Sequence, residues 1–145
     1  VFGIWENQAQ RVKEAVAPVQ SGPEALAAII RSTVEDFVPR MDDFRLAYLL
    51  GQVSGSSSLQ LSPEQFERIR PINDTLLGDA ARKLAEAGQP GPVDPRLFAF
   101  LAFASALGLL TMKGLVEAQG DPLLYSDEQL VGALSTIFTT AAGRR

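Results

Sequence analysis

PRLFAFLAFASALGLLTMKGLVEA, residues 95–118, is the stretch that decides the fold of this chain. Asp94-Pro95 at its start is typical of a helix N-terminus, because the Asp side chain accepts from the first backbone N–H groups and Pro lacks only an N–H that would be unpaired there. From Leu97 to Leu110 no side chain is charged, and Ser105 is the only polar one. A helix that is apolar on every side needs neighbours all round.

Small residues alternate with phenylalanine and leucine along this stretch, so another helix can approach it closely. We therefore expect one face to pack on the rest of the chain and another face to meet a second subunit. The alternative is the central core helix of a monomer. A membrane span is disfavoured, because the uncharged run is shorter than the ~20 residues that a span needs.

The composition excludes several classes of function. With 145 residues, 46% hydrophobic and 21% charged, the whole chain is expected to form one folded domain. Its net charge of −4, without a basic run before Arg144-Arg145, does not suit a large duplex-DNA footprint. The chain has neither cysteine nor histidine, which excludes disulfides, thiolate nucleophiles, imidazole bases and the commonest zinc ligands.

The absence of cysteine fits a cytoplasmic protein, and no secretory leader is visible at the start of the sequence. The chain begins with Val1 rather than Met, inside a segment that already has a helical pattern. We expect Val1 to be an internal residue of a longer protein or the start of a trimmed one.

Apolar residues recur with a helical period through most of the chain, and no segment alternates with period two for long enough to make a strand. The sequence therefore predicts an all-α fold of about six helices. They begin at Phe2, at Gly22 behind the cap Ser21, at Met41, at Pro63 behind Ser62, at Pro95, and behind Ser126. The third is expected over Met41 to Val53, and the serine-rich run 54–58 predicts a loop.

Pro71 falls inside the apolar pattern of the long helix that follows Ser62. A proline there removes a backbone hydrogen bond and bends the helix. Such a kink can open space in a bundle, so a cavity beside Pro71 is one interpretation. The other is a helix that ends and restarts at this residue.

The carboxylates offer little for catalysis. Asp42 and Asp43 point to different faces of a helix, while Glu64 and Glu67 lie near a helix N-terminus, where carboxylates are favoured on electrostatic grounds alone. Asp121, Asp127 and Glu128 have similar positions before and within the last helix. The sequence therefore predicts no enzyme, no metal site and no cofactor.

A pocket for an apolar or aromatic molecule is the better-supported site, because eight Phe, two Tyr, one Trp and two Met supply adaptable walls. Arg45 or the Tyr48 hydroxyl would anchor a polar group. The predicted lining consists of Phe37, Met41, Phe44, Arg45, Tyr48, Phe66, Ile69, Phe98 and Met112. The alternative for each of these residues is an ordinary core position.

The order of these elements carries a resemblance. The first elements are a capped helix after Gly22-Pro23-Glu24, a flexible loop and the long helix from Ser62. The apolar helix Pro95–Ala118 follows and ends before Gly120-Asp121-Pro122. The last element is an amphipathic helix led by Ser126 and Leu130. This layout resembles the C-terminal effector-binding and dimerisation domain of TetR-family transcriptional repressors, across essentially the whole chain.

The resemblance implies a homodimer in which the last two long helices of each subunit form a four-helix bundle, and a small, often hydrophobic, inducer among the middle helices. Leu97–Leu115 and Leu130–Ala141 would supply the dimer face. The predicted interface residues are Leu101, Ala104, Gly108, Leu115, Leu130, Leu134, Ile137 and Phe138.

The family's N-terminal helix-turn-helix is missing from this sequence, so DNA binding would belong to a domain not present in this chain. The helix that carries Phe2 and Trp5 would link that domain to the ligand site. The alternative function is a stand-alone helical dimerisation or adaptor module without a ligand. A third possibility, an enzyme that uses carboxylates, needs a buried Asp or Glu that the sequence does not locate.

Overall fold

The computed structural model describes residues 2–49, 62–86, 93–118 and 125–143, and all of its regular structure is helical. The five long helices are α1 (Phe2–Val16), α2 (Gly22–Phe37), α5 (Pro63–Ala85), α6 (Pro95–Ala118) and α7 (Asp127–Gly143). Between α2 and α5 lie the short helices η1 (Val38–Arg40), α3 (Met41–Phe44) and η2 (Arg45–Leu49). The predicted all-α fold is confirmed, with five long helices in place of about six.

The predicted helix over Met41 to Val53 accounts for the difference in number. Only Met41–Phe44 is α-helical, and Arg45–Leu49 widens into a π-helix; the remainder of the prediction lies outside the described residues. The carbonyl of Ala47 in this π-turn accepts a hydrogen bond of 3.2 Å from the indole N–H of Trp5. The prediction of a regular α-helix is wrong here, because the segment bonds to Trp5 of α1 as well as to its own backbone.

The serine caps form as predicted. The Ser62 hydroxyl accepts from the backbone N–H of Gln65, and the Gln65 side chain accepts from the backbone N–H of Ser62. Ser126 and Gln129 form the same reciprocal pair before α7. The Ser21 hydroxyl accepts from the N–H of Glu24 at 3.2 Å. These bonds satisfy N–H groups that a helix end leaves unpaired.

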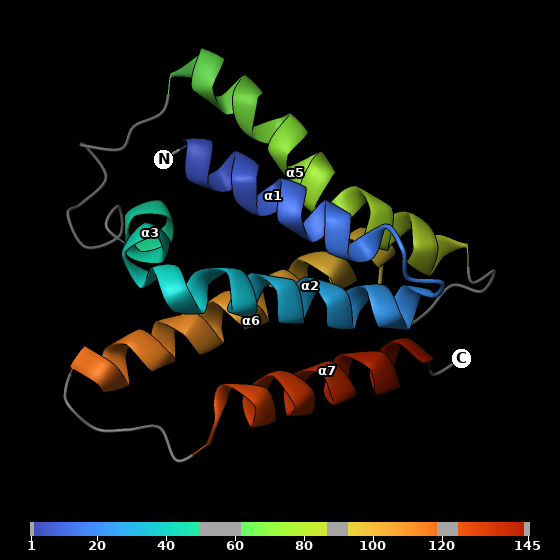
Figure 1. Cartoon of the computed structure of the whole chain (residues 1–145). Helices are drawn as coiled ribbons and strands as arrows, with labels where there is room; N and C mark the ends of the chain where they lie inside the picture. The colour runs from blue at the N-terminus through green and yellow to red at the C-terminus, as the bar shows by residue number, and fades with distance from the viewer. Residues whose placement is uncertain (1, 50–61, 87–92, 119–124, 144–145) are drawn as a thin grey trace.

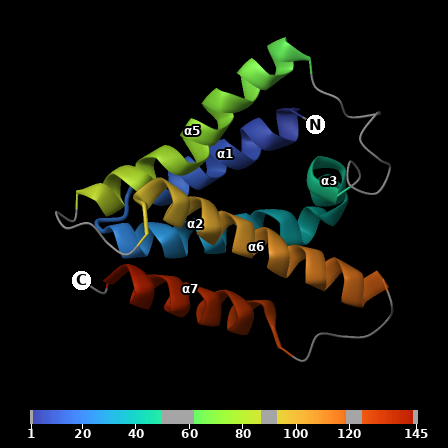
Figure 2. The same ribbon diagram turned by 180° about the vertical axis from the view of Figure 1, so that it is seen from behind.

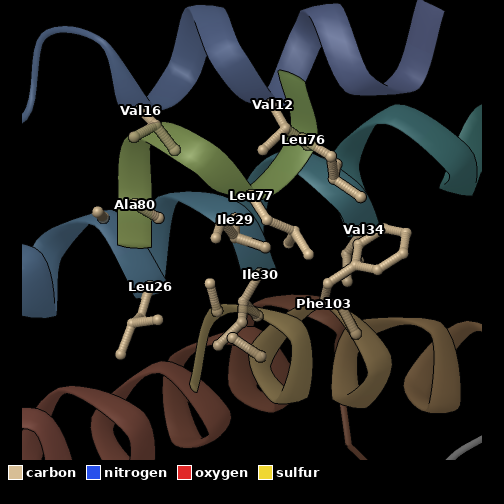
Figure 3. Packing of buried hydrophobic residues seen from close by; sticks show 14 of the residues in the cluster. Val12, Val16, Leu26, Ile29, Ile30, Val34, Leu76, Leu77, Ala80 and Phe103 are labelled. Carbon is tan, nitrogen blue, oxygen red and sulfur yellow. The ribbon is translucent and has the colours of Figure 1, made fainter. Parts of the chain in front are cut away.

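α2 lies at the centre of the molecule, between the α1–α5 pair and the α6–α7 pair (Figures 1 and 2). It packs on α1, α5, α6 and α7, while α6 and α7 contact each other only sparsely. The buried residues of α2 include Leu26, Ile29, Ile30 and Val34, which meet Val12 and Val16 of α1, Leu76 and Leu77 of α5 and Phe103 of α6 (Figure 3). The core is therefore built around α2 rather than around α6.

Close approach and hydrogen bonds from a lysine hold α1, α2 and α5 together. A Cβ added to Gly22 would lie 2.8 Å from the Cα of Leu84, so α2 and α5 cross at a distance that only glycine allows. The Lys83 ammonium donates to the carbonyls of Val16, Ala17 and Val19 at 2.6, 3.0 and 2.8 Å. Those carbonyls lie at the C-terminal end of α1, where a cation is favoured by the helix dipole.

α5 runs without interruption from Pro63 to Ala85, so the helix does not end and restart at Pro71. The Pro71 carbonyl accepts a hydrogen bond of 2.9 Å from the Thr75 hydroxyl. Because proline has no N–H, the carbonyl of Glu67, four residues earlier, loses its helical partner. This is the site where the sequence suggested open space.

Candidate interface and ligand grooves

α6 is anchored at both ends. The Asp94 side chain accepts from the N–H groups of Arg96 and Leu97 at 3.1 and 3.2 Å, as its position before Pro95 predicts. Near the other end the Lys113 ammonium pairs with Asp127 of α7 at 3.2 Å. Hydrogen bonds to Glu117 and Asp127 raise the pKa of Lys113. The cap thus defines the start of the helix, and the ion pair links its far end to α7.

One side of α6 is buried and the other is uncovered. Its buried residues, which pack toward the core, are Phe98, Ala99, Ala102, Phe103, Ala106 and Leu110. On the opposite side the side chains of Leu97, Leu101 and Leu115 remain 48%, 40% and 50% exposed. These side chains make an apolar strip along the uncovered side of the helix.

The residues of α6 on the side opposite its buried residues include a regular row. Alternate steps of four and three residues connect them, which is the spacing of a helix–helix seam. We call these residues the α6 row: Leu97, Leu101, Ala104, Gly108, Thr111 and Leu115. A Cβ added to Gly108 would meet no atom within 4 Å, so the middle of the row is open as well as small.

α7 carries a row of the same spacing on the side away from Val131, which is buried. The α7 row consists of Ser126, Leu130, Ala133, Ile137 and Thr140. Ile137 is 63% exposed, and Leu130 lines a narrow crevice with Leu109 and Leu110 of α6. Both rows therefore lie on the side of the α6–α7 pair that faces away from the core.

The predicted interface residues fall largely on these two rows. Leu101, Gly108, Leu115 and Ile137 are exposed, whereas Ala104 and Leu130 are half-buried. Leu134 and Phe138, which were also predicted to face a partner, are half-buried within the chain, and the Phe138 ring lies 5.9 Å from that of Phe98. Phe138 thus joins α7 to α6, and Leu134 packs against the core of the same chain.

Three of the predicted pocket residues come together in the interior. The Phe37 and Phe44 rings are fully buried, with centroids 5.6 Å apart, and Tyr48 lies 5.8 Å from Phe37 and 5.7 Å from Phe44. Phe103 of α6 closes this cluster at 6.2 Å from Tyr48. The rings pack on one another in the edge-on and tilted arrangements that aromatic cores favour.

The remaining predicted pocket residues are dispersed. Met41 and Arg45 lie against Gly114 near the end of α6, and Phe98 packs with Phe138. Met112 is exposed and Ile69 is half-buried. The side chain of Phe66 lies outside the described residues. The structure thus assembles the middle of the predicted lining but not one continuous wall.

A buried carboxylate lies beside the ring cluster. The Asp36 side chain is buried, pairs with Arg11 at 2.7 Å and with Arg40, and leaves Oδ2 without a hydrogen bond to any described residue. Burial, with a smaller contribution from the charge of Asp36, raises the pKa of Tyr48 well above its ordinary value. Asp36 is the buried acid that the enzyme hypothesis required, but its two arginine partners give it a structural role.

A groove of about 490 Å³ opens between α1 and α5 at Pro71, at the position that the sequence suggested. Ala9, Pro71 and Ile72 form its apolar part. The Arg68 guanidinium at its edge pairs with Glu6 at 2.8 Å and lies 4.7 Å from the centre of the Phe2 ring. Exposed glutamates make the rest of this groove polar.

A second groove, of about 400 Å³, lies between α5 and α6. Leu76, Leu77 and Phe103 form its buried floor, and Phe100, which is 49% exposed, forms one wall. Its polar rim consists of Asn73, Asp94 and Arg96, where Arg96 pairs with Asp74 at 3.0 Å. Its volume falls in the range of small-molecule sites. Sequence reasoning missed these residues, because their apolar pattern is the same as that of core positions.

The described residues contain no group of three or more His, Cys, Asp or Glu that could hold a metal ion. Most of the carboxylates considered for catalysis are in ion pairs, such as Asp42 with Arg45 at 3.0 Å. Glu128 and Arg31 form a two-bond pair, both bonds at 3.0 Å, which lowers the pKa of Glu128. By length and composition alone, residues 95–117 would also pass for a membrane span, a property that core helices of water-soluble proteins share.

The sequence matches no protein-family model, and no curated protein or solved structure gave a significant match.

Proposed function

We propose that this chain is the ligand-sensing and dimerisation domain of a TetR-like transcriptional repressor, which pairs with a second copy through α6 and α7 and binds a small hydrophobic effector. The observation that carries the proposal is the α6 row, with Leu97, Leu101 and Leu115 left about half exposed by the chain's own fold. A contiguous exposed apolar surface of this kind marks an interaction site.

The size of the surface suits a second copy. The α6 row spans roughly 27 Å, and two helices side by side are about 20 Å wide. The face therefore covers roughly 500 Å² on each copy, and about 1,000 Å² in total, which reaches the lower limit of specific interfaces. Two-fold pairing of identical patches is the commonest form of soluble oligomer.

Light scattering of the chain at micromolar concentration, without detergent, tests this part of the proposal. Two copies of the 15.6 kDa chain give a mass of about 31 kDa. A mass of 15.6 kDa throughout the micromolar range would refute the dimer. So would a chain that stays in solution only with detergent or vesicles, because a membrane would then cover α6.

The groove between α5 and α6 is the best-supported effector site, because its floor of Leu76, Leu77 and Phe103 is apolar and its rim is polar. Thermal-shift measurements with a panel of aromatic and aliphatic compounds test it. A compound at one hundred times its Kd should add about 2.7 kcal/mol to the free energy of unfolding. Phe100→Glu should remove the shift, and Leu46→Glu, at an exposed position outside the groove, should keep it.

A stand-alone dimerisation module without a ligand is the second candidate. The observation that favours it is the close packing of Phe37, Phe44 and Tyr48, which were expected to line a pocket. If no compound shifts the unfolding temperature while the chain remains a dimer, this candidate replaces the sensor.

DNA binding enters the proposal only through a domain outside this chain. Sequencing the coding frame upstream of Val1 tests it. A basic three-helix segment joined directly to Val1 is the expected result. A start codon immediately before Val1 would refute the repressor and leave the dimerisation module.

A further inference from the structure

We propose that the groove between α1 and α5 binds an organic cation with an apolar body, such as a quaternary ammonium group carried on an aromatic ring. This site is separate from the α5–α6 groove, and it depends neither on the dimer nor on the repressor. Three features of the groove support it: the divergence of the two helices, an apolar floor and a negatively charged rim.

One face of α1 and one face of α5 form the walls of the groove. The two helices run in the same direction and diverge toward their N-terminal ends (Figures 1 and 2). Where they are close, the Lys83 ammonium donates to the carbonyls at the C-terminal end of α1. Where they diverge, the Arg68 guanidinium reaches Glu6 at 2.8 Å. The groove of about 490 Å³ lies in this diverging part, and its volume is typical of small-molecule sites.

The floor of the groove is apolar. Ala9 is buried, Ile72 is half-buried, and the Pro71 ring adds a further apolar surface. Pro71 also affects the backbone, because the carbonyl of Glu67 loses its helical partner where residue 71 has no N–H. This carbonyl lies on the face of α5 that borders the groove, since Glu67 and Pro71 both line it. An apolar body would therefore cover the floor with hydrogen-bond acceptors beside it.

The rim of the groove carries more negative than positive charge. Glu6, Glu64 and Glu67 supply three carboxylates, while Arg68 is the one cation among the described lining residues. Arg68 is already engaged, because it pairs with Glu6 and lies 4.7 Å from the centre of the Phe2 ring. Glu64 and Glu67 are exposed and form no ion pair within the part of the chain that the structure describes. These two carboxylates remain for a cationic ligand, and they would repel an anion.

Glu67 is the more informative of these two carboxylates. Glu64 lies in the first turn of α5, where the helix dipole alone favours a negative charge. Glu67 lies a turn further along, and the effect of the dipole falls off within the first turn. A bare metal ion is not the expected ligand, because no three acidic side chains of the described residues converge as a metal site requires. An organic cation needs no such convergence, and its body would use the floor that a metal ion leaves uncovered.

Equilibrium dialysis with two naphthalene derivatives tests the proposal. The probes are naphthylmethyltrimethylammonium, a cation, and naphthylacetate, an anion with the same ring system. The cation should bind more tightly than the anion, and its Kd should rise with salt. Glu67→Gln should raise the Kd of the cation about fivefold, the upper end for an exposed ion pair, and the double variant Glu64→Gln with Glu67→Gln about tenfold or more. Both positions are exposed, so these substitutions leave the core intact.

Two control variants locate the bound cation. Glu86→Gln removes an exposed carboxylate of the same helix outside the groove and should leave the Kd unchanged. Phe100→Ala changes a wall of the α5–α6 groove and should also leave it unchanged. Equal affinity for cation and anion, no binding of the cation at millimolar concentration, or an unchanged Kd in the double variant would each overturn the inference. Loss of binding in Phe100→Ala would overturn it as well, because the cation would then occupy the α5–α6 groove.

Discussion

Replacing Leu101 with alanine should weaken the dimer. Complete burial of a leucine side chain is worth about 1.5–3 kcal/mol. Leu101 keeps 40% of its surface exposed in the single chain, and a second copy that covers this part would add ~0.6–1.2 kcal/mol. A homodimer contains two such residues, so the variant should lose ~1.2–2.4 kcal/mol of association free energy.

A loss of this size raises the dissociation constant about tenfold to fiftyfold. Sedimentation equilibrium over a range of loading concentrations measures it directly. The matched control is Leu46→Ala, because Leu46 is 43% exposed but lies on η2, away from both rows. An unchanged dissociation constant in Leu101→Ala, or an equal change in Leu46→Ala, would refute the assignment of the α6 row to the interface.

Two further predictions concern the fold. Gly22→Ala should cost ~1–3 kcal/mol of unfolding free energy, because its Cβ would clash with the Leu84 backbone. Gly78→Ala, the control, has free space around it and should be neutral or stabilising. Chemical denaturation of both variants measures the difference. Since burial raises the pKa of Tyr48, its folded state keeps the proton longer than the unfolded chain, and stability should fall as the pH rises above about 10. That fall should be shallower in Tyr48→Phe than in wild type or Tyr125→Phe, and equal slopes would contradict it.

The sequence predicted most of the local structure, because local signals determine where helices begin. Asp94, Ser62 and Ser126 each occupy a cap position, and α6 spans the residues expected for it. The π-turn after Phe44 could not be predicted, because it is associated with a bond between Ala47 and the distant Trp5. Helix propensity carries no information about such a partner.

Tertiary placement was harder to predict. α6 is apolar on every side, and its periodicity therefore could not show which side the core would cover. The structure places Ala99, Ala106 and Leu110 against the core and leaves Leu101 and Leu115 outside. The α5–α6 groove was equally hidden, because aromatic and aliphatic residues fill a core as readily as they line a cavity.

The reactivity of a single thiol on the α6 row tests the central claim most directly. Leu101→Cys and Leu46→Cys place one reporter each at positions of similar exposure in a chain without cysteine. If a second copy covers the α6 row, alkylation of Leu101→Cys should be slow at micromolar concentration and should accelerate on dilution, while the rate for Leu46→Cys stays constant. Equal rates at every concentration would show an uncovered row and would contradict the account.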